Sequence, residues 1–145
     1  MIGLLQRVTS ASVNVNGSVI AEIGRGLLVL VAVHRDDTEK DTARLAERIL
    51  AYRVFPDAEG RMNRSISDEK DGLLLVPQFT LAADTKKGTR ASFTRAADPE
   101  KGSEYFDQLV SLCQRGLDRV ETGEFGADMQ VSLINDGPVT FWLES

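Results

Sequence analysis

The chain is poor in the side chains on which many enzymes and metal proteins depend. Its 145 residues include one cysteine, Cys113, and one histidine, His34. A single cysteine excludes an intrachain disulfide and a cysteine-rich metal site. A single histidine excludes a zinc site built from several histidines, and any Ser-His-Asp or Cys-His couple would have to use His34.

The surroundings of these two residues favour structural roles. Cys113 shares a helical stripe with apolar residues such as Leu109 and Leu117, so we interpret it as part of the core. His34 follows an apolar run and opens the polar segment His34-Arg35-Asp36-Asp37. We interpret it as a solvated loop histidine and not as a catalytic base.

Long apolar runs are also lacking. None approaches the roughly 20 residues that a membrane helix needs. The N-terminal segment MIGLLQRV has too short an apolar part for a secretory signal, and Arg7 interrupts it. We therefore expect a cytoplasmic protein that is not bound to a membrane. The length and a composition with 42% hydrophobic and 27% charged residues predict one globular domain, residues 1–145.

The net charge of −5 argues against a broad, non-specific nucleic-acid footprint, because such binding rests on many phosphate contacts. Residues 85–95 are a local exception, with four cations and no acidic residue: Lys86, Lys87, Arg90 and Arg95. Taken alone, this stretch is interpreted as a solvated loop, although a local basic patch remains open.

Strand patterns outnumber helical ones along the chain. Asn16-Gly17 is typical of a two-residue hairpin turn, and residues 26–33 are apolar on both faces, as in a covered central strand. Helices are predicted from about Thr38 and from Asp98-Pro99, whereas residues 56–72 read as a polar loop. Further strands are predicted at 2–8, 11–15, 18–23, 73–79, 129–134 and 139–143. The pattern predicts an α+β fold: a strongly curved, barrel-like, mostly antiparallel β-sheet with two main α-helices.

Two stretches stand out as candidate functional segments. The first is VPQFTLAAD, residues 76–84, which leaves a buried strand and runs into the basic stretch. The second is NDGPVT, residues 135–140, where a Gly-Pro break interrupts strand-like sequence close to the apolar residues Phe141 and Trp142. Proline and glycine are poor strand residues, so something must hold this break in place. Thr80 is disfavoured as a nucleophile because no base lies near it in the sequence.

These stretches, with MIGLLQRV, the NGxV hairpin, Tyr52–Phe55 and Ala127–Val131, resemble the D-aminoacyl-tRNA deacylase (D-tyrosyl-tRNA deacylase) family over the whole chain. The resemblance implies a homodimeric hydrolase that needs no metal and no cofactor. Its substrate would be D-aminoacyl-tRNA, and glycyl-tRNA would also be accepted because glycine has no side chain to reject.

The resemblance also assigns roles to residues. The Gly137-Pro138 peptide would be cis, would enter the partner's active site and would exclude L-aminoacyl esters, with Arg7 bracing it. Main-chain N–H groups around Gln78, Phe79 and Thr80 would stabilise the oxyanion, assisted by the 2′-hydroxyl of the terminal adenosine. The remaining implied residues are Pro77, Met129 and Asn135 in the substrate pocket, and Lys86, Lys87, Arg90 and Arg95 on tRNA.

One position departs from the family pattern, because Pro77 stands where the family usually has serine. Proline removes a hydroxyl and an N–H, so we expect a bulge or an unpaired N–H position there. Three other readings stay open: a deacylase of relaxed chirality acting on glycyl- or small L-aminoacyl-tRNA, a non-catalytic tRNA-binding module, and a hydrolase using Thr80. The third lacks a base.

Overall fold

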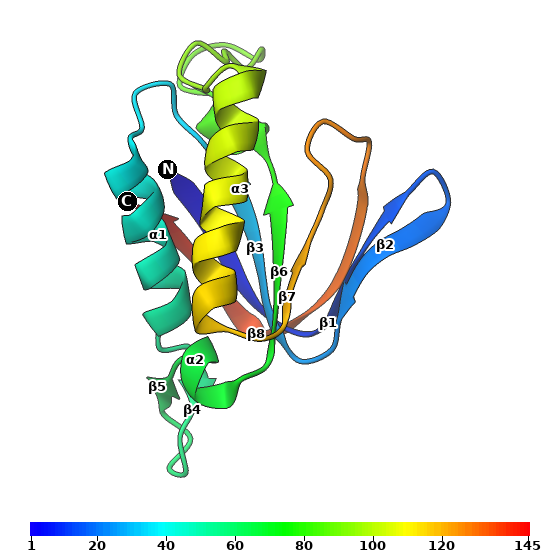
Figure 1. Ribbon diagram of the computed structural model, residues 1–145, viewed down its shortest axis with the longest axis vertical. Coiled ribbons are helices and arrows are strands. Elements are labelled where there is room, and N and C mark those ends of the chain that lie inside the picture. The colour runs from blue at the N-terminus through cyan, green and yellow to red at the C-terminus, as the bar shows by residue number, and fades with distance from the viewer.

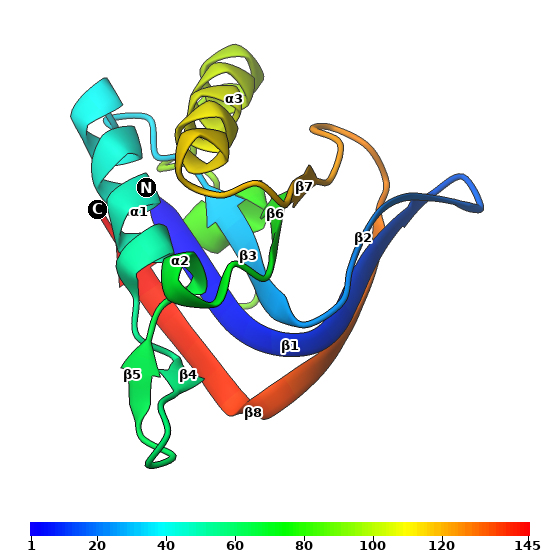
Figure 2. The same ribbon diagram turned by 60° about the horizontal axis from the view of Figure 1, so that its bottom comes forward.

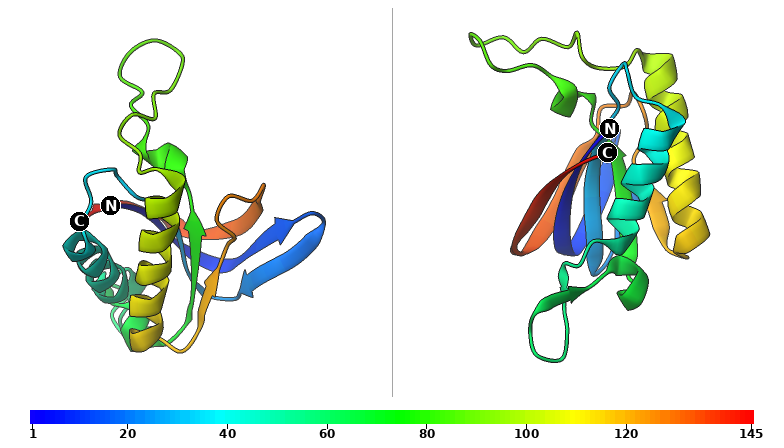
Figure 3. Two further views of the ribbon diagram at one scale, coloured as in Figure 1. Left: turned by 45° about the horizontal axis from the view of Figure 1, so that its top comes forward. Right: turned by 90° about the vertical axis from the view of Figure 1, so that its left-hand side faces the viewer.

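The computed structural model describes residues 1–145 and places two long helices on one side of a strongly bent, six-stranded mixed sheet (Figures 1 and 3). The strands of this sheet are β1 (Ile2–Val15), β2 (Ser18–Ile23), β3 (Gly26–Ala32), β6 (Gly72–Pro77), β7 (Val120–Thr122) and β8 (Gln130–Glu144). The helices are α1 (Glu39–Ala51), α2 (Ile66–Glu69), the 3-10 helix η1 (Phe79–Ala82) and α3 (Pro99–Gly116). A separate two-stranded sheet consists of β4 (Phe55–Pro56) and β5 (Met62–Arg64).

β1 organises the sheet because it pairs with three neighbours. Its first half lies between β3 and β8, and its second half lies between β2 and β8, all antiparallel. β8 follows β1 through the bend and forms an edge of the sheet (Figure 2). β3, β6 and β7 continue the sheet in parallel pairs, and β2 comes back into contact with β6 and β7. The predicted α+β class with a barrel-like, mostly antiparallel sheet and two main helices is confirmed.

The helices begin where their sequence signals predict. Thr38 is the N-cap of α1, and its main-chain N–H donates to Asp41 Oδ2 at 2.8 Å. Asp98 caps α3 by accepting a hydrogen bond from the main-chain N–H of Lys101 at 2.9 Å, and Pro99 is the first helical residue. Such caps satisfy main-chain donors that the first turn leaves without a partner. Local sequence therefore sets both helix starts.

The core lies mainly between the sheet and these two helices. Its fully buried large side chains include Leu5 of β1, Ile49 of α1, Leu75 of β6 and Leu109 of α3. Cys113 is completely buried among them, and burial raises the pKa of its thiol to about 12. The prediction of a core cysteine is confirmed. None of the helices is both long enough and apolar enough to span a membrane.

Three local predictions can be compared with the structure. The hairpin turn is confirmed, since Asn16 and Gly17 both have positive φ, at 51° and 80°. The prediction of an unstructured polar loop at residues 56–72 is wrong in part, because β4, β5 and α2 form within or beside it. The strands predicted at 2–8 and 11–15 are one continuous strand, because β8 pairs with both halves of β1.

Candidate active site

A cavity of about 590 Å³ opens at the carboxyl end of β6. Its walls come from the end of β6, the start of η1, the segment before α3 and the β7–β8 connection. The lining residues are Val76, Pro77, Gln78, Phe79, Phe93, Ala96, Ala97, Pro99, Phe125, Gly126, Ala127, Asp128, Met129 and Val131. Of the predicted site residues, Pro77, Gln78, Phe79 and Met129 therefore meet in one largely apolar pocket. Asp128 is the only ionisable side chain among them.

Pro77 fits the last position of β6 without a bulge. It pairs in register with Val31 of β3, and the N–H of the next residue, Gln78, donates to Val31 O at 2.7 Å. The nitrogen of Pro77 therefore faces the other neighbour, β7, which has already ended opposite Leu75. A residue without an N–H costs no ladder bond at this point. The expected unpaired N–H position is confirmed.

The chain turns at once from β6 into η1, whose first residue, Phe79, lines the cavity. The first hydrogen bond of η1 is donated by the N–H of Leu81 to Gln78 O at 3.2 Å. The N–H groups of Phe79 and Thr80 precede it and have no partner within the helix, as at any helix start. Thr80 is exposed and does not line the cavity, and its Oγ1 accepts a hydrogen bond from Gln78 Nε2 at 2.6 Å.

The Gly-Pro segment protrudes from β8 as a four-residue excursion. Gln6 of β1 pairs with Thr140 and Val8 pairs with Asn135, so residues 136–139 stand opposite Arg7 alone. We call residues 136–139 the tip. The Gly137–Pro138 peptide bond is cis, as the resemblance implied, and both residues are exposed. A β-carbon at Gly137 would lie 1.8 Å from the nitrogen of Val139, so this backbone accepts only glycine there.

Two side chains hold the base of the tip. Arg7 Nε donates to the main-chain oxygen of Asp136 at 3.1 Å, and an Arg7 guanidinium N–H also donates to the main-chain oxygen of Val54. Asn135 Nδ2 donates to the main-chain oxygens of Arg7 and Val139, at 2.9 and 3.1 Å, and so ties the two ends of the tip to β1. Asn135 thus lies with Arg7 in this bracing cluster and does not line the cavity of its own chain.

The tip and the cavity are separate sites within one chain. Neither Gly137 nor Pro138 is among the residues that line the cavity. The tip lies on β8 opposite Arg7, whereas the cavity lies at the carboxyl end of β6, between η1, the segment before α3 and the β7–β8 connection.

The predicted basic residues lie on that joining segment, which projects from the body (Figure 3). Asp84 and Ser92 close its outer part with two main-chain hydrogen bonds, at 2.8 and 3.1 Å. Lys86, Lys87, Arg90 and Arg95 are all exposed. We call residues 84–92 the basic loop. Its charges extend from the cavity rim into solvent, and Arg95 follows just outside it.

Sequence reasoning missed two aromatic residues of the cavity, Phe93 and Phe125. Each is an apolar side chain in an otherwise polar or glycine-rich stretch, which is the only signal that marked them. It also missed Gly123, where a β-carbon would lie 2.8 Å from Met129 Sδ and 3.3 Å from Pro77 Cδ. Gly123 therefore allows Met129 to pack over the end of β6.

His34 lies outside the cavity and is half-buried. Burial lowers the pKa of its imidazole, with the nearby Asp37 carboxylate partly opposing this shift. Its main chain bridges to Ala96, so His34 anchors the segment that leads into α3. The structure contains no group of three or more His, Cys, Asp or Glu side chains placed to hold a metal ion.

Comparison with known proteins shows the family of the chain. The family model described as D-Tyr-tRNA(Tyr) deacylase matches residues 4–144. The chain therefore belongs to the D-aminoacyl-tRNA deacylase family, a family of hydrolases.

Its relatives match over nearly their full lengths. The chain is 63% identical to the D-aminoacyl-tRNA deacylase of Alkalilimnicola ehrlichii, covering 100% of this chain and 97% of that one. It is 54% identical to the D-aminoacyl-tRNA deacylase of Escherichia coli O1:K1 / APEC, covering 99% of each. Among solved structures, the one described as c-Myc DNA Unwinding Element Binding Protein superposes with a TM-score of 0.96 at 38% identity, over 100% of this chain and 99% of that chain.

Proposed function

We propose that this protein hydrolyses the ester bond of D-aminoacyl-tRNA, releasing the D-amino acid and free tRNA. The observation that carries the proposal is a largely apolar cavity that has free main-chain N–H donors at one edge, no histidine, and Asp128 as its only ionisable side chain. The donors are the main-chain N–H groups of Phe79 and Thr80, which follow Gln78, and His34 lies outside the cavity. An activated ester needs stabilisation of its oxyanion more than it needs a strong protein nucleophile.

In this proposal the N–H groups of Phe79 and Thr80 bind the developing oxyanion. The substrate's terminal 2′-hydroxyl assists the attacking water, so the reaction needs no metal and no cofactor. Thr80 is not the nucleophile, because its Oγ1 faces the donor group of the Gln78 amide and that group accepts no proton. The terminal nucleoside and the aminoacyl group occupy the 590 Å³ cavity against Pro77 and Met129.

Chirality is decided by exclusion in this scheme. Rejecting an L-ester ten-thousandfold requires about 5.5 kcal/mol, at about 1.4 kcal/mol per factor of ten. A lost methylene contact supplies only about 1–3 kcal/mol, whereas a clash with immobile main chain supplies more. The tip, with Gly137 and Pro138 exposed and its base held by Arg7 and Asn135, has the properties of such a filter. Glycyl-tRNA passes because glycine has no side chain.

The filter has to come from a second copy of the chain. Gly137 and Pro138 do not line the cavity of their own chain, so each cavity is open without a partner. The outer edge of β8 pairs with no strand. Three of its large apolar side chains are exposed: Leu133, Ile134 and Trp142. A long edge strand with apolar side chains is a ready surface for association, so we propose a homodimer that joins through β8.

The deciding experiment is hydrolysis of matched D-tyrosyl-, L-tyrosyl- and glycyl-tRNA under one set of conditions. We expect rapid release from the D-ester, release from the glycyl ester, and at least a thousandfold slower release from the L-ester. Comparable D- and L-rates would establish the relaxed-chirality deacylase. Binding of tRNA without hydrolysis of any ester would establish the non-catalytic module.

A further inference from the structure

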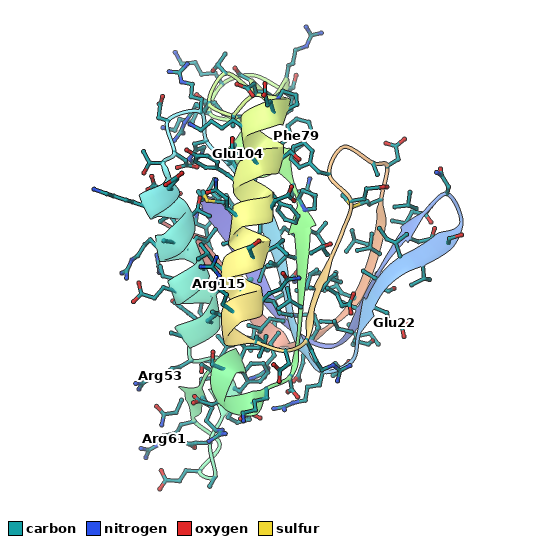
Figure 4. All side chains as sticks on the ribbon, in the orientation of Figure 1. Glu22, Arg53, Arg61, Phe79, Glu104 and Arg115 are labelled. Atoms are coloured by element: carbon teal, nitrogen blue, oxygen red, sulfur yellow. The ribbon has the colours of Figure 1, made fainter.

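Phe79 and Phe93 form an exposed aromatic pair at the rim of the cavity. Their ring centroids are 5.2 Å apart and their planes are tilted by 52°. The side chains remain 57% and 44% exposed, although other phenylalanines such as Phe55 and Phe106 are buried. Figure 4 labels Phe79 near the upper end of α3, below the projecting segment. Two large apolar rings left in water at the edge of a binding cavity indicate a contact surface.

The charges around this pair indicate the kind of ligand. Phe93 follows directly on the basic loop, which carries Lys86, Lys87 and Arg90. The main-chain hydrogen bonds between Asp84 and Ser92 fix the ends of this loop beside both rings. Exposed aromatic rings beside a row of cations are the combination with which proteins bind single-stranded nucleic acid. The rings stack on bases, and the cations contact the backbone phosphates.

We propose that the Phe79–Phe93 pair stacks on the penultimate base of the substrate's unpaired 3′ end, while Lys86, Lys87 and Arg90 contact the neighbouring phosphates. The proposal rests on the proposed function, in which the terminal nucleoside fills the cavity. The 5′-phosphate of that nucleoside joins it to the next nucleotide, so the strand has to leave the cavity across the rim. The rim offers the two half-exposed rings and then the basic loop.

This arrangement suits an enzyme that acts on many tRNAs. Every base has a π-face, so stacking tolerates any sequence and reads only that the 3′ end is single-stranded. The cavity then holds the reacting group, and Phe93 with the basic loop holds the strand behind it.

Kinetics on long and short substrates test the inference. D-tyrosyl-tRNA and 3′-O-D-tyrosyl-adenosine share the reacting group, but only the first has a penultimate base. Truncation of one stacking ring costs about 1–3 kcal/mol per base, or roughly 5–150-fold in affinity. We expect Phe93→Leu to lower kcat/KM for the tRNA at least fivefold more than for the adenosine ester. Phe93→Trp, which keeps a stacking face, should restore most of the difference.

A fluorescence measurement tests stacking without hydrolysis. The probe is an RNA oligonucleotide with 2-aminopurine at the penultimate position and an amide-linked D-tyrosine at its 3′ end. Stacking quenches 2-aminopurine, so we expect quenching with the wild type and clearly weaker quenching with saturating Phe93→Leu. The melting temperatures of Phe93→Leu and Phe93→Trp show whether either substitution disturbs folding.

The outcomes separate this inference from the proposed function. Equal losses on the two substrates would place the terminal adenine on Phe93 and overturn the inference while deacylation stands. Unchanged fluorescence at saturation, or absence of binding, would also overturn it. Quenching by a wild-type protein that hydrolyses no ester would overturn the proposed function and leave the inference intact.

Discussion

Arg7 contacts Asp136 twice: its Nε donates to the main-chain oxygen at 3.1 Å and lies 3.2 Å from the carboxylate Oδ2. The Arg7 side chain is only 13% exposed, whereas that of Asp136 is 42% exposed. A partly buried guanidinium on β1 thus fixes the base of the tip on β8, whose Gly137 and Pro138 are exposed. This pair links the rigid centre of the sheet to the proposed filter.

Removing this link should loosen chirality before it abolishes hydrolysis. Arg7→Ala removes hydrogen bonds of a charged donor, each worth about 1.5–3 kcal/mol, and frees the tip to move. We expect the ratio of D- to L-tyrosyl-tRNA hydrolysis to fall roughly 10–100-fold, mainly through a faster L-rate. Arg48→Ala is the matched control, because Arg48 also donates to a main-chain oxygen of β8, at Glu144, but far from the tip. Proportional loss of both rates in Arg7→Ala would show that the tip is not the filter.

A charge on the free edge of β8 should separate the proposed dimer. Trp142→Glu replaces a side chain that is 50% exposed on this edge. Burying an unpaired carboxylate is costly, so we expect a monomer in analytical ultracentrifugation, together with reduced D-activity and lost chiral discrimination. Met62→Glu is the control, at a side chain that is 51% exposed on β5. It should change neither the oligomeric state nor the activity and its chiral discrimination. A wild-type protein that is monomeric at assay concentrations, yet active and able to discriminate D- from L-esters, would contradict the proposed dimer.

Thr80→Ala should keep deacylation within about tenfold of the wild type in single-turnover experiments. The main-chain N–H at residue 80 survives the substitution, and only the hydroxyl that accepts from Gln78 Nε2 is lost. Removal of a true nucleophile would cost several orders of magnitude. A thousandfold drop with an unchanged melting temperature would therefore establish Thr80 as a catalytic side chain.

Charge reversal in the basic loop should weaken tRNA binding through its salt dependence. Each phosphate contact contributes about 0.7–0.9 to the slope of log affinity against log salt concentration. We expect Lys86→Glu or Lys87→Glu to reduce the magnitude of that slope by about 0.7 or more, the contribution of at least one phosphate contact. Arg61→Glu is the control, since Arg61 is 80% exposed at the opposite end of the molecule (Figure 4). Equal slopes in all variants would return the loop to a solvated surface.

The buried thiol predicts a pH dependence of stability. Burial raises the pKa of Cys113 from 9.0 to about 12, so above pH 9 the unfolded chain releases a proton that the folded chain keeps. The unfolded state then binds fewer protons, and the free energy of unfolding falls as pH rises, by about 1.4 kcal/mol per pH unit from this group. Urea titrations from pH 8 to 10 should show a shallower fall for Cys113→Ala. Identical slopes would mean that the thiol is not buried.

Several features of the fold could be predicted from the sequence because neighbouring residues decide them. Asn16-Gly17 satisfies the positive φ of the hairpin turn, and Thr38 and Asp98 satisfy the free N–H groups of their helices. The Gly-Pro break could be identified as a held segment because strand residues flank it. In the turn and the caps the interactions are complete within a few residues of the chain, whereas the Gly-Pro break is held by the distant Arg7.

Tertiary structure alone decided where those features lie relative to one another. Pairing of β8 along both halves of β1 places four tip residues opposite Arg7 and brings Asn135 to that bracing cluster, away from the cavity. The cavity gathers Phe93 and Phe125 from segments with no local pattern of their own. The sequence by itself determined the turns and the helix caps, since their partners are close along the chain, and it marked the Gly-Pro break as unusual for a strand. The separation of tip and cavity followed only from long-range strand pairing, which no short stretch of sequence encodes.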